Sequence, residues 1–196
     1  MGLLDWVFGK KEEISKSSEM LDEELYWRLI DNSLENSSNQ EEQAGSLIDE
    51  IEKLSHKEMI GFRLRTDRFL HDTYGSEMWC VAYIVNGGCS DHGFEYFRHW
   101  LISRGKEAYY TVKENPDRLA EIVNPGVELY DFEAFRFVAD DAFERKTGKD
   151  LDDFIDHDNF KTSEGNYPKF EFTWKEDDSE SMKKICPKLY NMYLED

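Results

Sequence analysis

Apolar residues recur at helical spacing along most of the chain. From residue 22 onward they repeat at intervals of three and four positions, with Leu25 and Leu29 as the first example. An α-helix has 3.6 residues per turn, so this spacing places the apolar side chains on one face. The same pattern returns in four later stretches: 44–54, 59–70, 94–101 and 132–143. The chain is therefore predicted to be mainly helical.

Residues that start and stop helices flank these stretches. Ser55 is followed three positions later by Glu58, the spacing of a capping box. Gly87 and Gly148 follow apolar stretches, and glycine readily adopts the left-handed conformation found just past helix ends. Other residues whose side-chain oxygen suits a helix start are Asp22, Asn39, Ser90 and Asn115.

Two stretches do not show the helical pattern. Residues 78–85 form a continuous apolar run, which fits a buried helix or a buried strand. We favour a helix, because no partner strand is evident. Residues 157–175 include the alternating aromatics Phe170, Phe172 and Trp174, which predict an extended arm laid over the helices.

These patterns together predict an all-α fold. A length of 196 residues fits one domain. We expect a single compact multi-helix domain over residues 20–196, with at most a short extended or strand segment near 170–174. Its last helical stretch should break at Pro187. Six aromatic side chains are predicted to share the core: Trp79, Phe94, Phe97, Trp100, Phe135 and Phe143.

Residues 1–19 are expected to form a flexible N-terminal segment with an apolar tip. The tip contains Leu3, Leu4, Trp6, Val7 and Phe8. It is too short to hold a membrane alone, and Trp6 stands where myristoylation needs Ser or Thr. Docking on the protein's own body or on a partner, weak membrane contact and disorder all stay open.

Composition narrows the class of protein. Asp and Glu total 43 against 24 Lys and Arg, which gives a net charge of −19. Such a surface repels phosphate, so nucleic-acid binding is not expected.

No apolar run reaches the roughly 18 residues of a membrane span, and no leader peptide is recognisable. The three cysteines, Cys80, Cys89 and Cys186, have no metal-binding spacing. We expect a cytoplasmic protein with reduced thiols.

The most distinctive stretch is residues 86–102, NGGCSDHGFEYFRHWLI. It resembles the signature of a bacterial family catalogued as domain of unknown function 4240. His92 stands where such sequences more often carry an acidic or small residue. Supporting stretches are YWRLID at 26–31, FEAF at 132–135, the segment 138–149 and PKLY at 187–190. The resemblance covers about residues 20–195 and implies a single, mostly helical domain without an assigned activity.

Candidate binding residues lie in the same stretch. Asp91 and Arg98 are seven positions apart, two helical turns, and so lie on nearly the same face. If this face lines a groove, Arg98 could bind a carboxylate or phosphate and Asp91 a cationic group. His92 and Tyr96 are further candidates. The alternative is an internal salt bridge or cap that tethers the glycine turn.

Catalytic and metal sites are weaker hypotheses. Cys89 precedes a helix start with His92 close by, but a third orienting group is not identifiable. His92 and His99 are about 10.5 Å apart along a helix, too far to share one ion. The aspartates between 150 and 158 lack the glycine and closing glutamate of an EF-hand. We therefore predict no catalytic residue, no metal site and no cofactor.

Two classes of function remain open. The first is an acidic protein-interaction module that captures a basic partner protein, as an immunity or antitoxin-like protein does. The second is an enzyme or small-ligand binder that uses a groove beside residues 86–100. The acidic composition favours the first, and the density of aromatic residues supports the second.

Overall fold

The computed structural model describes residues 13–162 and 166–195, and these form an all-α fold without strands, as predicted. The α-helices are α1 (Glu23–Glu35), α2 (Gln40–Ile51), α3 (His56–Asp72), α4 (Ser76–Asn86), α5 (Asp91–Ser103), α6 (Lys106–Glu114), α7 (Val138–Thr147), α8 (Ser179–Ile185) and α9 (Pro187–Tyr193). Short 3-10 helices are η1 (Pro116–Glu121), η2 (Glu133–Phe137) and η3 (Asp152–Phe154).

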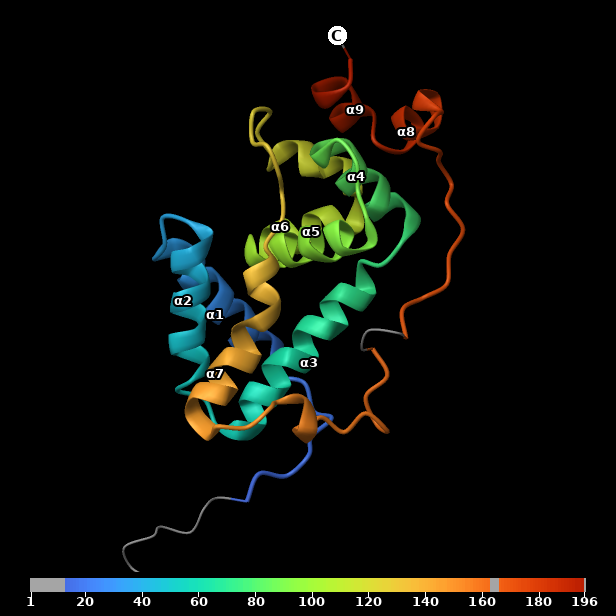
Figure 1. Ribbon diagram of the computed structural model, residues 1–196. Helices are drawn as coiled ribbons and strands as arrows, with labels where there is room; N and C mark the ends of the chain where they lie inside the picture. The colour runs from blue at the N-terminus through green and yellow to red at the C-terminus, as the bar shows by residue number, and fades with distance from the viewer. Residues whose placement is uncertain (1–12, 163–165, 196) are drawn as a thin grey trace, which may run out of the picture.

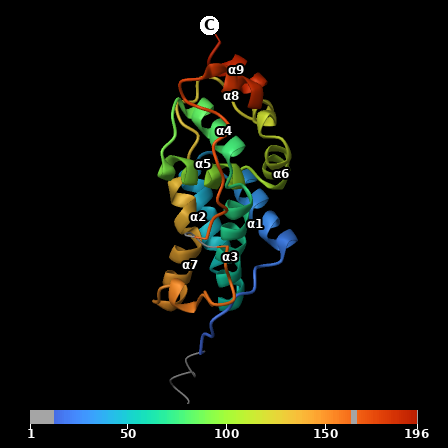
Figure 2. The same ribbon diagram turned by 90° about the vertical axis from the view of Figure 1, so that its right-hand side faces the viewer.

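The helices are arranged in two halves. Figures 1 and 2 show α1, α2, α3 and α7 side by side in one half, with α5 crossing their ends. The other half contains α4, α6, α8 and α9. One hydrophobic core runs through the molecule, and all six predicted core aromatics are buried in it. None of the helices in the described part of the chain is long and apolar enough to cross a membrane.

The predicted helix boundaries follow from local chemistry. Ser55 and Glu58 form both halves of a capping box at the start of α3. The side chain of Ser90 accepts a hydrogen bond from the Gly93 N–H at 3.1 Å and caps α5. Gly87 ends α4 with a φ of 64°, a left-handed conformation that costs glycine no steric strain. The apolar run 78–85 lies within α4 and is thus a buried helix.

Residues 132–143 differ from the single helix that their periodicity predicts. The segment begins as the 3-10 helix η2 and continues as α7 only from Val138. The reason is a tertiary contact: the Phe132 N–H donates to the Tyr96 carbonyl of α5 at 3.1 Å. A 3-10 turn then places Phe132 and Phe135 on the same side, because side chains three positions apart are eclipsed. Both rings are buried.

The predicted arm is present and lies over the helices. The chain from residue 166 to 178 passes beside α3 and α4 without forming a strand (Figures 1 and 2). The Phe172 ring packs edge-on against Trp79, with ring centroids 5.4 Å apart. The Trp174 Nε1–H donates to the Ser76 carbonyl at 2.9 Å. These aromatic contacts hold the arm on the domain without a partner strand.

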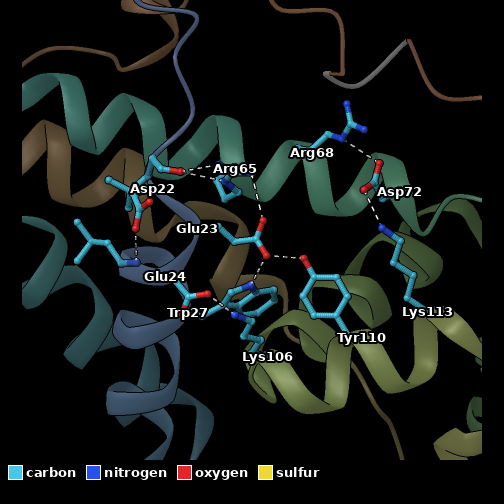
Figure 3. Close-up of polar contacts among 12 residues, drawn as sticks. Asp22, Glu23, Glu24, Trp27, Arg65, Arg68, Asp72, Lys106, Tyr110 and Lys113 are labelled. Atoms are coloured by element: carbon cyan, nitrogen blue, oxygen red, sulfur yellow. Dashed lines mark hydrogen bonds and ion pairs between the residues drawn. The ribbon is translucent and has the colours of Figure 1, made fainter.

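Polar contacts join α1, α3 and α6 where these three helices meet (Figure 3). The Glu23 carboxylate accepts from Tyr110 Oη at 2.5 Å and from Trp27 Nε1 at 3.3 Å. Burial, with Glu23 beside it, raises the pKa of Tyr110 to about 12, so this phenol remains a donor. Asp72 pairs with Lys113 at 2.8 Å. The Glu23–Tyr110 hydrogen bond thus joins the start of α1 to α6, and the Asp72–Lys113 pair joins α6 to the end of α3.

The segment before α1 contacts the domain. The Ser17 N–H donates to the Phe154 carbonyl, and the Asp156 N–H donates to the Ser17 carbonyl, both at 3.0 Å. The predicted apolar tip falls within residues 1–12, which lie outside the described residues.

Candidate functional site

A cleft opens beside residues 86–100, where a groove was anticipated. It lies between the C-terminal end of α3, the start of α4, the first turns of α5 and the arm. The inner part has a volume of about 160 Å³ and is lined by Tyr74, Trp79, Asp91, His92, Glu95, Arg98 and Tyr167. The outer part, about 680 Å³, shares four of these residues and adds Pro168, Lys169, Phe170 and Phe172. We call the two parts together the aromatic cleft.

Arg98 forms the floor of the aromatic cleft and is only 2% exposed. Its Nη1 donates to the Leu70 carbonyl at 2.6 Å, and its Nε donates to the Phe94 carbonyl at 3.3 Å. The Leu70 carbonyl belongs to the last turn of α3, where helix carbonyls lack partners within the helix. The negative end of the α3 dipole thus lies against the buried positive charge.

Three aromatic rings surround the Arg98 guanidinium. Its carbon lies 4.4 Å from the centroid of Phe94 and 5.0 Å from those of Tyr74 and Tyr167. Tyr74 and Tyr167 stack almost parallel, with centroids 4.4 Å apart. Such contacts stabilise a desolvated cation by about 2 kcal/mol or more. Burial nevertheless lowers the pKa of Arg98 from its ordinary value.

The charge of Arg98 is not neutralised by an ion pair. Across residues 13–162 and 166–195, no carboxylate lies within ion-pairing distance of its guanidinium. The internal Asp91–Arg98 salt bridge considered above therefore does not form. Asp91 is exposed at the mouth of the cleft, and its carboxylate makes no hydrogen bond or ion pair with another described residue. Glu95, the nearest acid along α5, pairs instead with Arg136 at 2.9 Å.

The structure brings together three of the four candidate binding residues. Asp91, His92 and Arg98 all line the inner cleft. Tyr96 does not: its hydroxyl donates to Glu133 in η2 at 3.0 Å, and this hydrogen bond raises the pKa of the phenol. The His92 and Tyr96 rings lie 6.4 Å apart at the edge of this region.

Cys89 lacks the features of a nucleophile. Burial raises the pKa of its thiol to about 12, and the positive charge of nearby Arg98 offsets only part of this rise. Sγ lies 3.6 Å from the Ser90 carbonyl, to which it can only donate. The thiol is therefore protonated near neutral pH, and thiolates, not thiols, attack. All three cysteines are free.

His99, the third residue of the metal hypothesis, is buried in the core. Burial lowers the pKa of its ring to about 3, so the imidazole is neutral. Nδ1 lies 3.1 Å from the Glu95 carbonyl and must carry the proton, since a carbonyl only accepts. Within the part of the chain that is described, no three His, Cys, Asp or Glu side chains are grouped to hold a metal ion.

A second surface feature lies along α7 and η3. This groove of about 480 Å³ is lined by Arg63, Arg136, Phe137, Asp140, Asp141, Glu144, Gly148, Lys149, Asp150, Leu151 and Asp152. We call it the acidic groove. Arg63 pairs with Asp140 at 2.9 Å and with Asp67 at 3.1 Å. Desolvation raises the pKa of both carboxyls, although Arg63 opposes the rise.

The remaining acids of the acidic groove face solvent. Asp141, Glu144, Asp150 and Asp152 are exposed, and Phe137 at the end of η2, which lines the same groove, is 44% exposed. Asp150 also accepts from the Asp152 N–H at 3.0 Å, so part of the cluster caps a turn, as its sequence indicated.

Tyr74 and Tyr167 line the aromatic cleft and were not expected there. Tyr74 stands in the turn between α3 and α4, and Tyr167 precedes the alternating aromatics of the arm. The predicted arm is the only sequence signal that points toward Tyr167, because the two tyrosines meet across more than ninety positions.

Comparison with known protein families shows which family the chain belongs to. Residues 21–145 match the family model described as "Protein of unknown function (DUF4240)". The chain belongs to this family. The match to DUF4240 spans α1 to most of α7 and includes the α5 side of the aromatic cleft, but it ends short of the arm and of the 187–190 stretch. No curated protein and no solved structure matches the chain significantly.

Proposed function

We propose that this DUF4240 protein is a cytoplasmic interaction module that captures a basic partner protein, in the manner of an immunity or antitoxin-like protein. The observation that carries the proposal is the acidic groove, whose lining includes four exposed carboxylates and the exposed ring of Phe137, beside the cations Arg63, Arg136 and Lys149. The cytoplasmic location is proposed from the odd number of cysteines and their lack of a disulfide-framework spacing in the sequence.

The acidic groove has the elements of a protein interface. Exposed aromatic side chains are common anchors of binding energy, and Phe137 is the exposed large apolar residue in this lining, whereas Leu151 is buried. Asp141, Glu144 and Asp152 can pair with Lys or Arg of a partner. A net charge of −19 adds long-range attraction, which speeds encounter with a basic protein.

Charge reversal in the acidic groove tests this function. The partner is first isolated from the native host with the wild-type protein, and it should be basic. The double variant Asp141→Lys, Glu144→Lys should then slow association with that partner at least about tenfold, measured by stopped-flow or surface-based kinetics.

A matched control separates the groove from general charge. Glu107→Lys, Glu114→Lys makes the same change in net charge on α6, in the other half of the molecule (Figures 1 and 2). It should slow association only about twofold. An acidic partner, or equal effects of the two double variants, would contradict docking at the acidic groove.

A second function is supported by the aromatic cleft: we propose that it binds a small ligand. An inner cavity of about 160 Å³ continues into an open outer cleft, and a buried arginine without a carboxylate partner lines the inner part. Concave aromatic sites with a few converging polar groups are typical of ligand pockets. Burial keeps the Cys89 thiol beside the cleft protonated, so it is not proposed as a nucleophile here.

A further inference from the structure

We propose that the aromatic cleft recognises a small zwitterion of the amino-acid class, with its carboxylate on Arg98, its ammonium on Asp91 and an apolar side group against the aromatic walls. This inference rests on the second proposed function, ligand binding in the cleft, and adds the chemical class of the ligand. It is independent of the acidic groove.

Arg98 provides the carboxylate site. It is buried and lines the inner cavity, and its charge has no ion-pair partner among the described carboxylates. Two of its nitrogens are already fixed by the Leu70 and Phe94 carbonyls, and the Tyr167 hydroxyl is a further hydrogen-bonding neighbour, so the guanidinium is held in place before a ligand arrives. Arginine presents several N–H donors in one plane, which suits a carboxylate.

Asp91 provides the ammonium site. Its carboxylate lines the same inner cavity and has no partner among the described residues. Asp91 and Arg98 are about 10.5 Å apart along the α5 axis. Long helical side chains point back toward the N-terminus, and the bond from Arg98 Nε to the Phe94 carbonyl shows this direction. The guanidinium thus approaches Asp91 across the cavity.

Aromatic side chains provide the apolar wall. Trp79 and Tyr74 flank the inner cavity, and Phe170 and Phe172 continue the wall outward. Phe172 is 54% exposed although it contacts Trp79, so it leaves apolar surface open to a ligand. Covering this surface would favour binding of an aromatic or branched aliphatic group.

The mixed charge of the lining favours a zwitterion over a simple ion. An anion on Arg98 would lie beside the unpaired Asp91 carboxylate, since Glu95 is paired with Arg136, and a cation on Asp91 would lie beside the Arg98 guanidinium. Each single charge is therefore repelled by one neighbour. A ligand with adjacent ammonium and carboxylate groups satisfies both.

Titration calorimetry with matched probes tests the inference on the full-length protein. The probes are L-phenylalanine and L-leucine, with 3-phenylpropionate lacking the ammonium and phenethylamine lacking the carboxylate. At least one amino acid should bind with a Kd below about 1 mM, and both single-charge analogues should bind at least about tenfold more weakly than phenylalanine. Comparing analogues tests Arg98 without mutating this buried side chain.

Variants assign the ammonium site. Asp91→Asn should weaken the amino acids about tenfold and leave 3-phenylpropionate unchanged or tighter. Asp141→Asn, an equal change of charge in the acidic groove, should alter the affinity neither for the amino acids nor for 3-phenylpropionate.

Indole, a neutral probe, tests whether the cleft binds an aromatic ring without any charge. If indole or 3-phenylpropionate binds as tightly as phenylalanine, the zwitterion inference is wrong while ligand binding stands. If no probe binds at about 10 mM, both are wrong.

Discussion

Burial has different effects on the charge of two neighbouring side chains in this protein. Arg98 and His99 are neighbours on α5, yet burial affects them differently. Arg98 stays close to three rings and two carbonyls, which compensate for its charge. His99 lies beside the Phe135 ring and remains neutral, since desolvation and the nearby Arg98 both lower its pKa. The first residue faces a cavity, and the second belongs to the core.

The neutral state of His99 predicts a dependence of stability on pH. Its pKa is about 3 when folded, against an ordinary histidine value of 6.5. Below pH 6.5 the unfolded chain binds a proton that the folded protein does not, so this residue reduces stability as the pH falls toward 3. The contribution approaches about 1.4 kcal/mol per pH unit.

Comparison with a variant isolates this contribution. His99→Gln should flatten the fall in the free energy of unfolding between pH 6.5 and 4, measured with denaturant at each pH. Parallel curves for the wild type and the variant would show that His99 does not titrate on unfolding.

A single substitution at Phe97 tests how tightly the core is packed. The side chain is fully buried, and its ring contacts Trp100 with centroids 5.8 Å apart. Phe97→Ala should lower the free energy of unfolding by about 3 to 5 kcal/mol, because a cavity replaces the ring. A loss below about 1 kcal/mol in denaturant unfolding would place Phe97 outside the tightly packed core.

At the scale of elements, local signals were enough to predict most helices. Ser55 with Glu58, Ser90, and Gly87 act through hydrogen bonds or backbone conformation within a few residues, so their effects can be predicted from sequence. The start of η2 depends on a bond from Phe132 to the carbonyl of Tyr96, far away in sequence. Helical periodicity contains no signal for such a contact.

The candidate site also has one part that the sequence could predict and one part that depends on long-range contacts. Asp91, His92 and Arg98 share one face of α5, which their spacing predicts. The opposite wall comes from Tyr74 and the arm, and its position depends on ring contacts between distant segments. The sequence could thus predict one side of the aromatic cleft but not that it closes over Arg98.

Two glycines predict opposite effects of the same substitution. Gly87 has a φ of 64°, and a Cβ there would meet no atom within 4 Å, so Gly87→Ala should cost about 1 kcal/mol from backbone strain alone. Gly45 lies inside α2 with equally open space, and Gly45→Ala should stabilise by about 0.5 to 1 kcal/mol. Thermal unfolding of both variants should show melting temperatures that move in opposite directions. A shift of the same sign would refute the assignment of Gly87 as the helix stop.

At the scale of the whole molecule, charge and shape separate two surfaces. The acidic groove lies along α7 and η3, and the aromatic cleft lies between α5 and the arm. The groove combines exposed carboxylates with Arg63, Arg136 and Lys149, whereas the cleft combines acids with buried Arg98 and aromatic walls. The two proposed functions therefore use different residues, and variants at one site should leave the other unaffected.

The central claim is that a net charge of −19 draws a basic partner to the acidic groove. The most direct test is the association rate with the isolated partner as salt increases from 0.1 to 1 M. The Debye length falls from about 10 to about 3 Å over this range, so exposed charges become screened. Association should slow markedly while dissociation changes little. An association rate that is indifferent to salt would contradict electrostatic capture.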